Sequence, residues 1–192
     1  MTPTDRKKIQ TISINREIPK GPIHVVTMGQ ALTMGISGAL GGAVGGGVAG
    51  AVQSSTPNEP AARTMGIIDK NGIEVETLIR EEFIKQASAR HLFKVAHAPA
   101  DGEIKIIVPT WGIMVPSPYQ SALRPFVMVS VILKDASGRV LWKDVERSSH
   151  LNFSVPRHSL EEFEAKPELL RDGLRDAAVA AVAKLMDNYS KQ

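Results

Sequence analysis

The sequence contains no cysteine, which excludes disulfide bonds, thiolate metal sites and a cysteine nucleophile. It also lacks zinc-site spacing, because no two histidines sit at a ligand separation and no acidic residue joins them in a helical ligand motif. The histidines are His24, His91, His97, His150 and His158. No Gly-x-Ser-x-Gly nucleophile elbow surrounds the serines before His150. We therefore predict that the protein is not an enzyme and has no catalytic residue, no bound metal, no cofactor and no small-molecule substrate.

A concentrated basic surface is lacking as well. Lysine and arginine number 23 against 20 aspartates and glutamates, and apart from residues 6–8 the basic residues are interspersed with acidic ones. This distribution is not the electrostatic footprint of a nucleic-acid-binding protein, so we expect no nucleic acid partner. The chain has 192 residues, of which 43% are hydrophobic, and this is enough for one folded domain with an appended segment.

Full charges are missing from residues 21–58, and eight of the sixteen residues from 35 to 50 are glycine. A glycine row at spacing four has the small-xxx-small pattern that lets helix backbones approach closely in lipid. A large-residue row repeats at the same spacing. The glycine row is Gly38, Gly42, Gly46 and Gly50, and the large-residue row is Met28, Leu32, Ile36, Leu40, Val44, Val48 and Val52. We predict that residues 28–56 form an insert for membrane contact or self-association, and we assign that role to both rows between Leu32 and Gly50.

The conformation of this insert stays open at the level of sequence. A helix with eight interior glycines costs roughly 8 kcal/mol relative to alanine, so it needs a membrane or another helix as a partner. A β-hairpin bending near residues 45–47 is the alternative, because the large apolar side chains from 32 to 52 all occupy even positions. A disordered or buried glycine loop is the third interpretation. The match to a dinucleotide fingerprint at residues 45–50 lacks the βαβ context, so we predict no nucleotide site.

Hydrophobic periodicity outside the insert predicts an α+β fold. The expected strands are residues 9–14, 103–108, 126–133 and 139–147, and the expected helices are residues 73–90 and 167–189. A hairpin turn joins the last two strands, residues 56–60 read as a loop, and residues 150–167 read as an irregular connection. This order predicts a mostly antiparallel sheet with two main helices on one face and a Gly-rich hydrophobic insert after the first strand. The expected organisation is residues 1–27 as N-terminal segment and first strand, 28–56 as insert, and 57–192 as the remainder of the domain.

The topology constrains the insert. If the first strand pairs with the later strands, both ends of the insert lie on the same side of any membrane, and a single crossing is impossible. The insert would then be a hairpin, lie on a surface, or pack against copies of itself.

A Pro-rich loop at residues 109–125 is the second candidate site. Trp111, Met114, Tyr119 and Phe126 gather large side chains there, and loops carried by a sheet commonly hold binding sites. These four residues are therefore candidates for binding a partner. The alternative is that Trp111 and Phe126 bury themselves in the core, as most large aromatic side chains do.

Two stretches of sequence resemble bacterial lipoproteins. Residues 5–14, Asp-Arg-Lys-Lys-Ile-Gln-Thr-Ile-Ser-Ile, resemble the opening of many such proteins just after the lipidated cysteine. Residues 133–142, Leu-Lys-Asp-Ala-Ser-Gly-Arg-Val-Leu-Trp, resemble the hairpin of their periplasmic α+β domain, and the closing helix at 174–185 is similar too. The broader architecture is similar to the curli-secretion-channel and penicillin-binding-protein-activator lipoproteins, and the insert alone to the glycine-zipper region of rickettsial surface antigens. The resemblance implies an oligomeric outer-membrane lipoprotein facing the periplasm, although the lipobox cysteine is absent here.

Two functional hypotheses follow. The chain opens without a secretory signal, which fits a cytoplasmic protein or a mature-length chain without its export signal, and the resemblance favours the second. We therefore expect a bacterial cell-envelope protein at the periplasmic face of the outer membrane. The first hypothesis is a structural or assembly component that forms a homo-oligomer or contacts the membrane through its insert. The second is a periplasmic binding or regulatory module that docks onto another envelope complex through residues 109–126.

Overall fold

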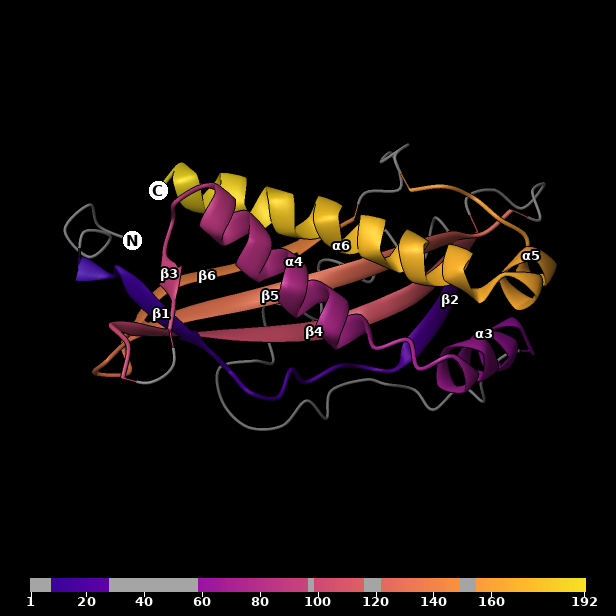
Figure 1. Cartoon of the computed structure of the whole chain (residues 1–192), viewed down its shortest axis with the longest axis horizontal. Coiled ribbons are helices and arrows are strands. Elements are labelled where there is room, and N and C mark those ends of the chain that lie inside the picture. The colour runs from indigo at the N-terminus through magenta and orange to yellow at the C-terminus, as the bar shows by residue number, and fades with distance from the viewer. Residues whose placement is uncertain (1–7, 28–58, 97–98, 116–121, 149–154) are drawn as a thin grey trace.

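The computed structural model describes residues 8–27, 59–96, 99–115, 122–148 and 155–192. They form an α+β domain in which helices cover one face of a six-stranded mixed sheet (Figure 1). The strand order is β3-β1-β4-β5-β6, and β2 also pairs with β4. The strands are β1 Thr11–Ile14, β2 Ile23–Thr27, β3 Lys94–Val95, β4 Gly102–Val115, β5 Arg124–Asp135 and β6 Val140–Arg147. The helices are α3 Glu59–Lys70, α4 Val75–Ala89, α5 Leu160–Ala165 and α6 Pro167–Ser190. The predicted α+β class, with a mostly antiparallel sheet and helices packed against it, is confirmed.

β5 is the centre of the antiparallel part of the sheet, paired with β4 on one side and β6 on the other. Its inner face consists of Val127, Val129, Val131 and Leu133, and all four are 0% exposed. These side chains belong to the same hydrophobic core as the buried faces of α4 and α6. The alternating apolar side chains of β5 and the apolar stripes of the helices, which repeat every 3.6 residues, therefore pack into one core.

The long helix α6 begins at the predicted residue and buries one apolar stripe. Pro167 stands at its first turn, where a missing N–H removes no intrahelical bond. The stripe residues are Leu170, Leu174, Ala177, Ala181 and Leu185, and all are buried. Near the C-terminus the ring of Tyr189 packs edge-on against Phe93 at 4.8 Å and against Trp142 at 4.9 Å between centroids. This aromatic cluster ties α6 to both β6 and the segment before β3.

The structure extends the predicted strand at residues 103–108 and corrects the Pro-rich loop that was expected after it. β4 continues through Pro109 to Val115, and β5 already begins at Arg124. The register shifts between Ile107 and Thr110, so Pro109 lies at a bulge, where its missing N–H does not break the ladder. Proline predicts a loop at this position, but the bulge accommodates it within the strand.

Four elements are missing from the sequence prediction: the two-residue strand β3, and β2, α3 and α5. β2 follows residues that read as the end of a strand, and its parallel pairing with β4 depends on contacts distant in sequence. α3 contains Gly66 and several β-branched residues, which lower its helix propensity, and packing of its buried face supplies the rest. α5 lies within the connection read as irregular, although Ser159 and Glu162 form a capping box that signals it.

β1 pairs in parallel with the start of β4, from Ile12 opposite Gly102 to Ile14 opposite Ile104. The first strand therefore pairs with a later strand, so both ends of the insert lie on the same side of any membrane. The stretch of chain between β2 and α3 leaves and re-enters one folded domain. None of the helices among the described residues has the length and apolar character needed to cross a membrane.

Truncating the inner face of β5 is expected to destabilise the fold. Val131 is 0% exposed, whereas Val140 at the start of β6 is 52% exposed, so the two valines form a matched pair on one hairpin. Val131→Ala should lower the free energy of unfolding by about 2–3 kcal/mol, through lost burial and a residual cavity. Val140→Ala should change it by less than about 0.5 kcal/mol. Urea denaturation measures both, and equal effects would contradict the core described above.

Acid is expected to weaken the turn between β5 and β6. Hydrogen bonds from Ser137 and Arg139 lower the pKa of Asp135 from 3.8 to about 2. Because the folded-state pKa is depressed, the contribution of this carboxylate to stability is complete above pH 3.8 and is lost as the pH falls toward 2. An NMR titration of the Asp135 carboxyl should give this low value, and Asp135→Asn should remove this part of the acid dependence. A carboxyl that titrates near its ordinary pKa would count against the turn geometry.

Candidate functional site

The chain that leads to the insert is fixed along the outer edge of β4. The Gly21 N–H donates to the Val108 carbonyl at 2.8 Å, and the Val108 N–H donates to the Pro19 carbonyl at 2.8 Å. Lys20 bridges Val108 in the same parallel register. β2 then continues beside residues 111–115 of β4. The backbone is thus held by hydrogen bonds up to the last residue before the insert.

β2 approaches β4 so closely that two positions require glycine. A Cβ added to Gly112 would lie 2.0 Å from the His24 carbonyl oxygen, and the φ of Gly112 is +143°, which disfavours any side chain. A Cβ added to Gly21 would lie 2.2 Å from the Pro109 carbonyl oxygen. His24, opposite Gly112, is half-buried, and this burial lowers the pKa of its imidazole. The two glycines therefore permit the pairing that anchors the insert on its N-terminal side.

Trp111 reinforces this anchor from the core side of the sheet. It is 3% exposed and belongs to the main core, and its indole Nε1–H donates to the Gly21 carbonyl at 2.8 Å. The Lys20 ammonium lies 5.7 Å from the centre of its ring and also forms an ion pair with Glu76 of α4 at 2.7 Å. Trp111, a candidate for partner binding, is placed by the structure where it holds the chain entering β2.

The chain that returns from the insert is fixed by α3. Ile67 and Ile68 of this helix are buried in the main core, and α3 contacts β2. On its outer side Arg63 forms an ion pair with Glu164 of α5 at 2.7 Å, and this contact lowers the pKa of the Glu164 carboxyl. β2 and α3 together form what we call the insert anchor. It places both ends of the insert at one end of the domain (Figure 1).

The rows predicted to mediate self-association lie outside the described residues, as does Tyr119. The structure therefore describes the insert anchor and three of the four residues of the second candidate site. Met114 and Phe126 form a small buried cluster of their own, separate from the main core. They lie on the face of the sheet turned away from the helices, which we call the open face, whereas Trp111 lies on the helix face. The three described residues of this candidate site are thus not brought together at one exposed surface.

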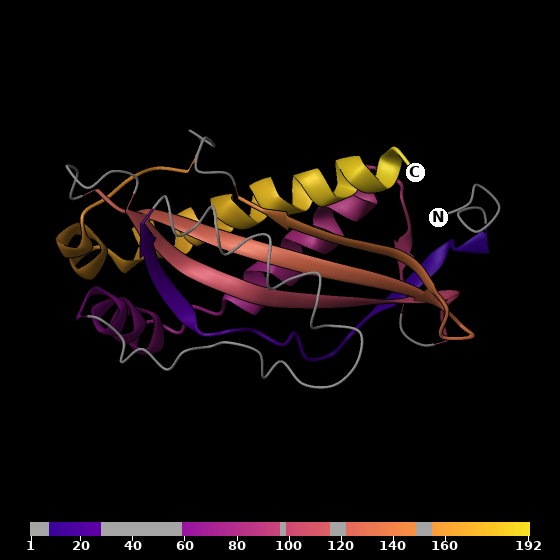
Figure 2. The same cartoon turned by 180° about the vertical axis from the view of Figure 1, so that it is seen from behind.

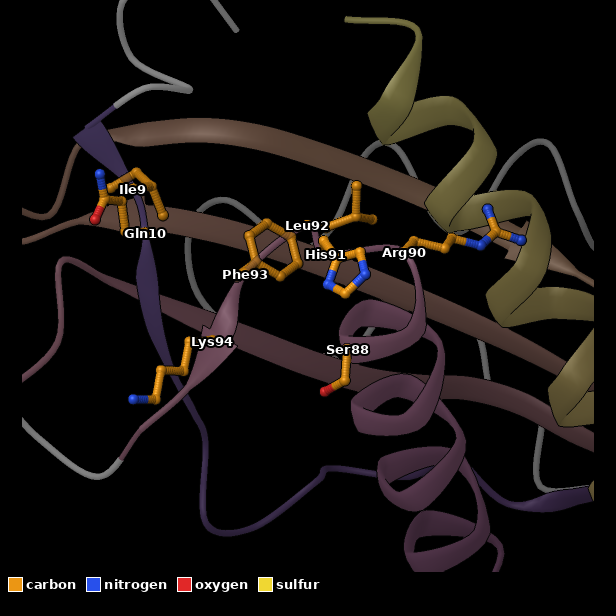
Figure 3. Close-up of a pocket in the computed structure, with 8 residues that line it drawn as sticks. All are labelled: Ile9, Gln10, Ser88, Arg90, His91, Leu92, Phe93 and Lys94. Carbon is orange, nitrogen blue, oxygen red and sulfur yellow. The ribbon is translucent and has the colours of Figure 1, made fainter.

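An open pocket of about 770 Å³ lies at the opposite end of the domain, beside β1, β3 and the end of α4 (Figure 3). Its lining is Ile9, Gln10, Ser88, Arg90, His91, Leu92, Phe93 and Lys94. Arg90 extends toward α6, where it forms an ion pair with Asp187, while Lys94 points away from it. His91 has a left-handed backbone, with φ of +52°, as the chain turns out of α4. The basic side chains that line the pocket therefore do not converge on one point, and we assign the pocket no ligand.

Two further titratable side chains, His158 and Glu82, serve local structure. The Nδ1 of His158 lies 3.7 Å from a Glu162 oxygen, and its ring packs edge-on against Phe163. Glu82 is buried but accepts a hydrogen bond from Gln86 at 2.7 Å within α4. Across the described ranges, no three histidine, aspartate or glutamate side chains are grouped so that they could hold a metal ion.

No family model matches the chain, and no curated protein matches it. Among solved structures it is similar to protein XCC0632 from Xanthomonas campestris, which carries the family description DUF330. The two chains share 12% sequence identity with a TM-score of 0.45, over 93% of this chain and 81% of that one. We transfer neither a family nor a function from that protein.

Two glycine-to-alanine changes should have opposite effects at the insert anchor. Gly112→Ala should lower the free energy of unfolding by about 2 kcal/mol or more, because the backbone is strained for alanine and the methyl group meets the His24 carbonyl. Gly66→Ala in α3 meets nothing within 4 Å and should raise stability by about 0.5–1 kcal/mol. Thermal unfolding distinguishes them, and a neutral Gly112→Ala would show that β2 is not held against β4.

Proposed function

We propose that the protein is a non-enzymatic structural component of the bacterial cell envelope that joins copies of itself through its glycine-rich insert. The observation that carries this proposal is the insert anchor. The insert departs from β2 and returns to α3, two elements that contact each other and are built into the same domain. Backbone hydrogen bonds hold the chain on the N-terminal side of the insert, and buried side chains of α3 hold the chain on its C-terminal side.

An insert held at both ends has to fold back on itself or lie along a surface. A single membrane crossing would put β2 and α3 on opposite sides of the bilayer, which their contact within one domain does not allow. The glycine row then becomes a narrow strip on which another backbone can pack closely. Roughly 1 kcal/mol per interior glycine opposes an isolated helix, so an ordered insert needs a partner, and a second copy supplies an identical row.

The charged side chains around the insert anchor support a structural role. Lys20, just before β2, is paired with Glu76 of α4, and Arg63 of α3 is paired with Glu164 of α5, so each pair ties one flank of the insert to another helix. A single exposed ion pair of this kind contributes little to the free energy of unfolding. In this domain the pairs help to fix the relative positions of β2, α3, α4 and α5. The role of the domain in this proposal is to hold both ends of the insert in fixed positions.

The envelope location and contact with the outer membrane rest on the resemblance of residues 5–14 and 133–142 to bacterial lipoproteins. The uncharged composition of residues 28–58 suits an apolar environment, such as lipid or another copy. We include membrane contact in the proposal as the setting in which self-association takes place.

Docking onto another envelope complex through residues 109–126 is the alternative. Trp111 is buried with its N–H bonded to the Gly21 carbonyl, and Met114 and Phe126 are buried on the open face. Residues 109–115 belong to β4. Since the three described residues of this candidate site are all buried, we favour assembly through the insert.

Substitutions in the glycine row test the proposal. Gly42→Leu and Gly46→Leu place a bulky side chain on the predicted contact strip, at a cost of about 1–3 kcal/mol from overpacking. We expect the intact protein in mild detergent to be a discrete oligomer, and each variant to associate about tenfold to a hundredfold more weakly. Light scattering coupled to size-exclusion chromatography measures the mass.

Gly66→Leu is the matched control, because Gly66 lies in α3 with nothing within 4 Å of its would-be Cβ. This variant should retain the mass of the intact protein. An intact chain that is monomeric, or an oligomer that both glycine-row variants leave unchanged, would contradict self-association through the insert and direct attention to residues 109–126.

A further inference from the structure

β6 is the last strand in the order of the described sheet, and among the described strands it pairs only with β5. Figure 2 shows it at the margin of the sheet, alongside α6. A strand at the margin of a sheet presents backbone N–H and C=O groups onto which an extended chain can add as a further strand. Whether β6 offers such a site depends on what its outward backbone groups bind.

The pairing with β5 determines which backbone groups of β6 face outward. The Ser148 N–H donates to the Val127 carbonyl at 3.0 Å, in the register of the β5–β6 pair. In an antiparallel pair, residues that bond to the partner strand alternate with residues whose backbone groups point away from it. The residues of β6 that direct their backbone groups toward the outer edge are therefore Lys143, Val145 and Arg147.

Charged side chains bind two of these outward groups. The Val145 N–H donates to a carboxylate oxygen of Asp144 at 2.8 Å. The Arg147 C=O accepts a hydrogen bond from the Lys184 ammonium of α6 at 3.1 Å. Both bonds are charge-assisted, which makes them stronger than bonds between neutral groups. One backbone donor and one backbone acceptor are thereby withdrawn from pairing with a further strand.

Asn188 of α6 holds the carboxylate that binds the Val145 N–H. Its amide Nδ2 donates to the other oxygen of Asp144 at 2.9 Å and to Glu146 at 2.8 Å. Lys184 and Asn188 are four residues apart, which places them on the same side of the helix, one turn from each other. One stripe of α6 therefore lies along the outer edge of β6.

The charges of β6 also oppose pairing with the β6 of another copy. Antiparallel pairing about a two-fold axis places the residues of both strands symmetrically about one central residue. A centre at Lys143, Asp144 or Glu146 sets that charged residue against its own counterpart. A centre at Val145 sets Lys143 against Arg147, and it sets the two carboxylates of the strand against each other. Like charges directly opposite each other destabilise a strand pair.

We propose that α6 and the charged side chains of β6 close this edge of the sheet, so that neither another copy nor an extended peptide adds to it as a strand. Partners of the domain are thereby restricted to its other surfaces. This inference does not depend on the proposed self-association, but it excludes the β6 edge as the place where copies meet.

Amide hydrogen exchange in the full-length chain tests the bond at Val145. The Val145 N–H should exchange about tenfold more slowly than the Lys143 N–H, which points to the same edge, because its bond to Asp144 has to open first. Asp144→Ala should remove this difference. Equal exchange of the two amides in the intact protein would overturn the assignment of Asp144 as a cap on the edge.

Asp144→Ala combined with Lys184→Met tests whether the edge is closed. It removes both charged caps and leaves a two-fold register centred on position 144 without like charges opposite each other. The variant should associate about tenfold or more tightly than the intact protein, measured by light scattering coupled to size-exclusion chromatography in mild detergent. Adding Lys143→Pro should abolish this gain, because proline removes an outward N–H and leaves the pairing with β5 in place.

Asp172→Ala combined with Lys85→Met is the matched control, because it makes the same changes of charge at exposed positions of α6 and α4. This control should keep the mass of the intact protein. The proposal is overturned if the variant without caps keeps that mass too, or if Lys143→Pro leaves the gain unchanged. If the combined variant does not fold, Lys184→Met alone, which retains the bonds of Asp144, is judged by the same two outcomes. An intact protein that is monomeric would contradict the proposed self-association but not the closed edge.

Discussion

The pairing of β4 along both of its edges is the constraint on which the rest of the structure depends. On one edge it holds β1, Lys20 and β2 in parallel, and on the other it holds β5. The N-terminal chain therefore runs the length of the domain before the insert begins. The bulge near Pro109 and the missing side chain at Gly112 make this possible, because β4 has to accommodate a proline and a backbone in very close approach. The position of both ends of the insert follows from this pairing.

The sequence was most informative where side-chain periodicity reflects burial directly. β5, β6, α4 and α6 were predictable because their apolar residues repeat at the period of the element and face one core. The first strand and the hairpin turn at Asp135 were also predictable, since the turn residues have specific backbone and hydrogen-bond preferences. These elements were sufficient to derive the α+β class.

The remaining elements depend on contacts that periodicity does not encode. Gly112 and Gly21 permit the close parallel pairing of β2 with β4. The sequence does not distinguish a glycine that a neighbouring strand requires from any other glycine. Helix α3 is stabilised by burying Ile67 and Ile68, not by its propensity. Pro109 predicts a loop by its local preference, although proline is tolerated at bulges. In these cases tertiary packing overrides the local preference.

The candidate sites show the same division. Trp111 was noted in sequence as either a binding residue or a core residue, and the structure buries it where its N–H holds the Gly21 carbonyl. One sequence signal for the open face was available: the unbroken run from Phe126 to Leu133 is apolar except for Ser130, which is typical of a strand covered on both sides. Length and composition indicate the insert, but where its ends are anchored could be learned only from the fold.

The central claim is that the anchored insert joins copies of the chain, and recovery of one copy by another tests it most directly. Two forms of the intact chain, one tagged and one untagged, can be produced in the same cells and purified through the tag in mild detergent. The account predicts that the untagged form is recovered with the tagged form in a fixed ratio. Recovery of the tagged chain alone, folded and monomeric, would contradict the claim.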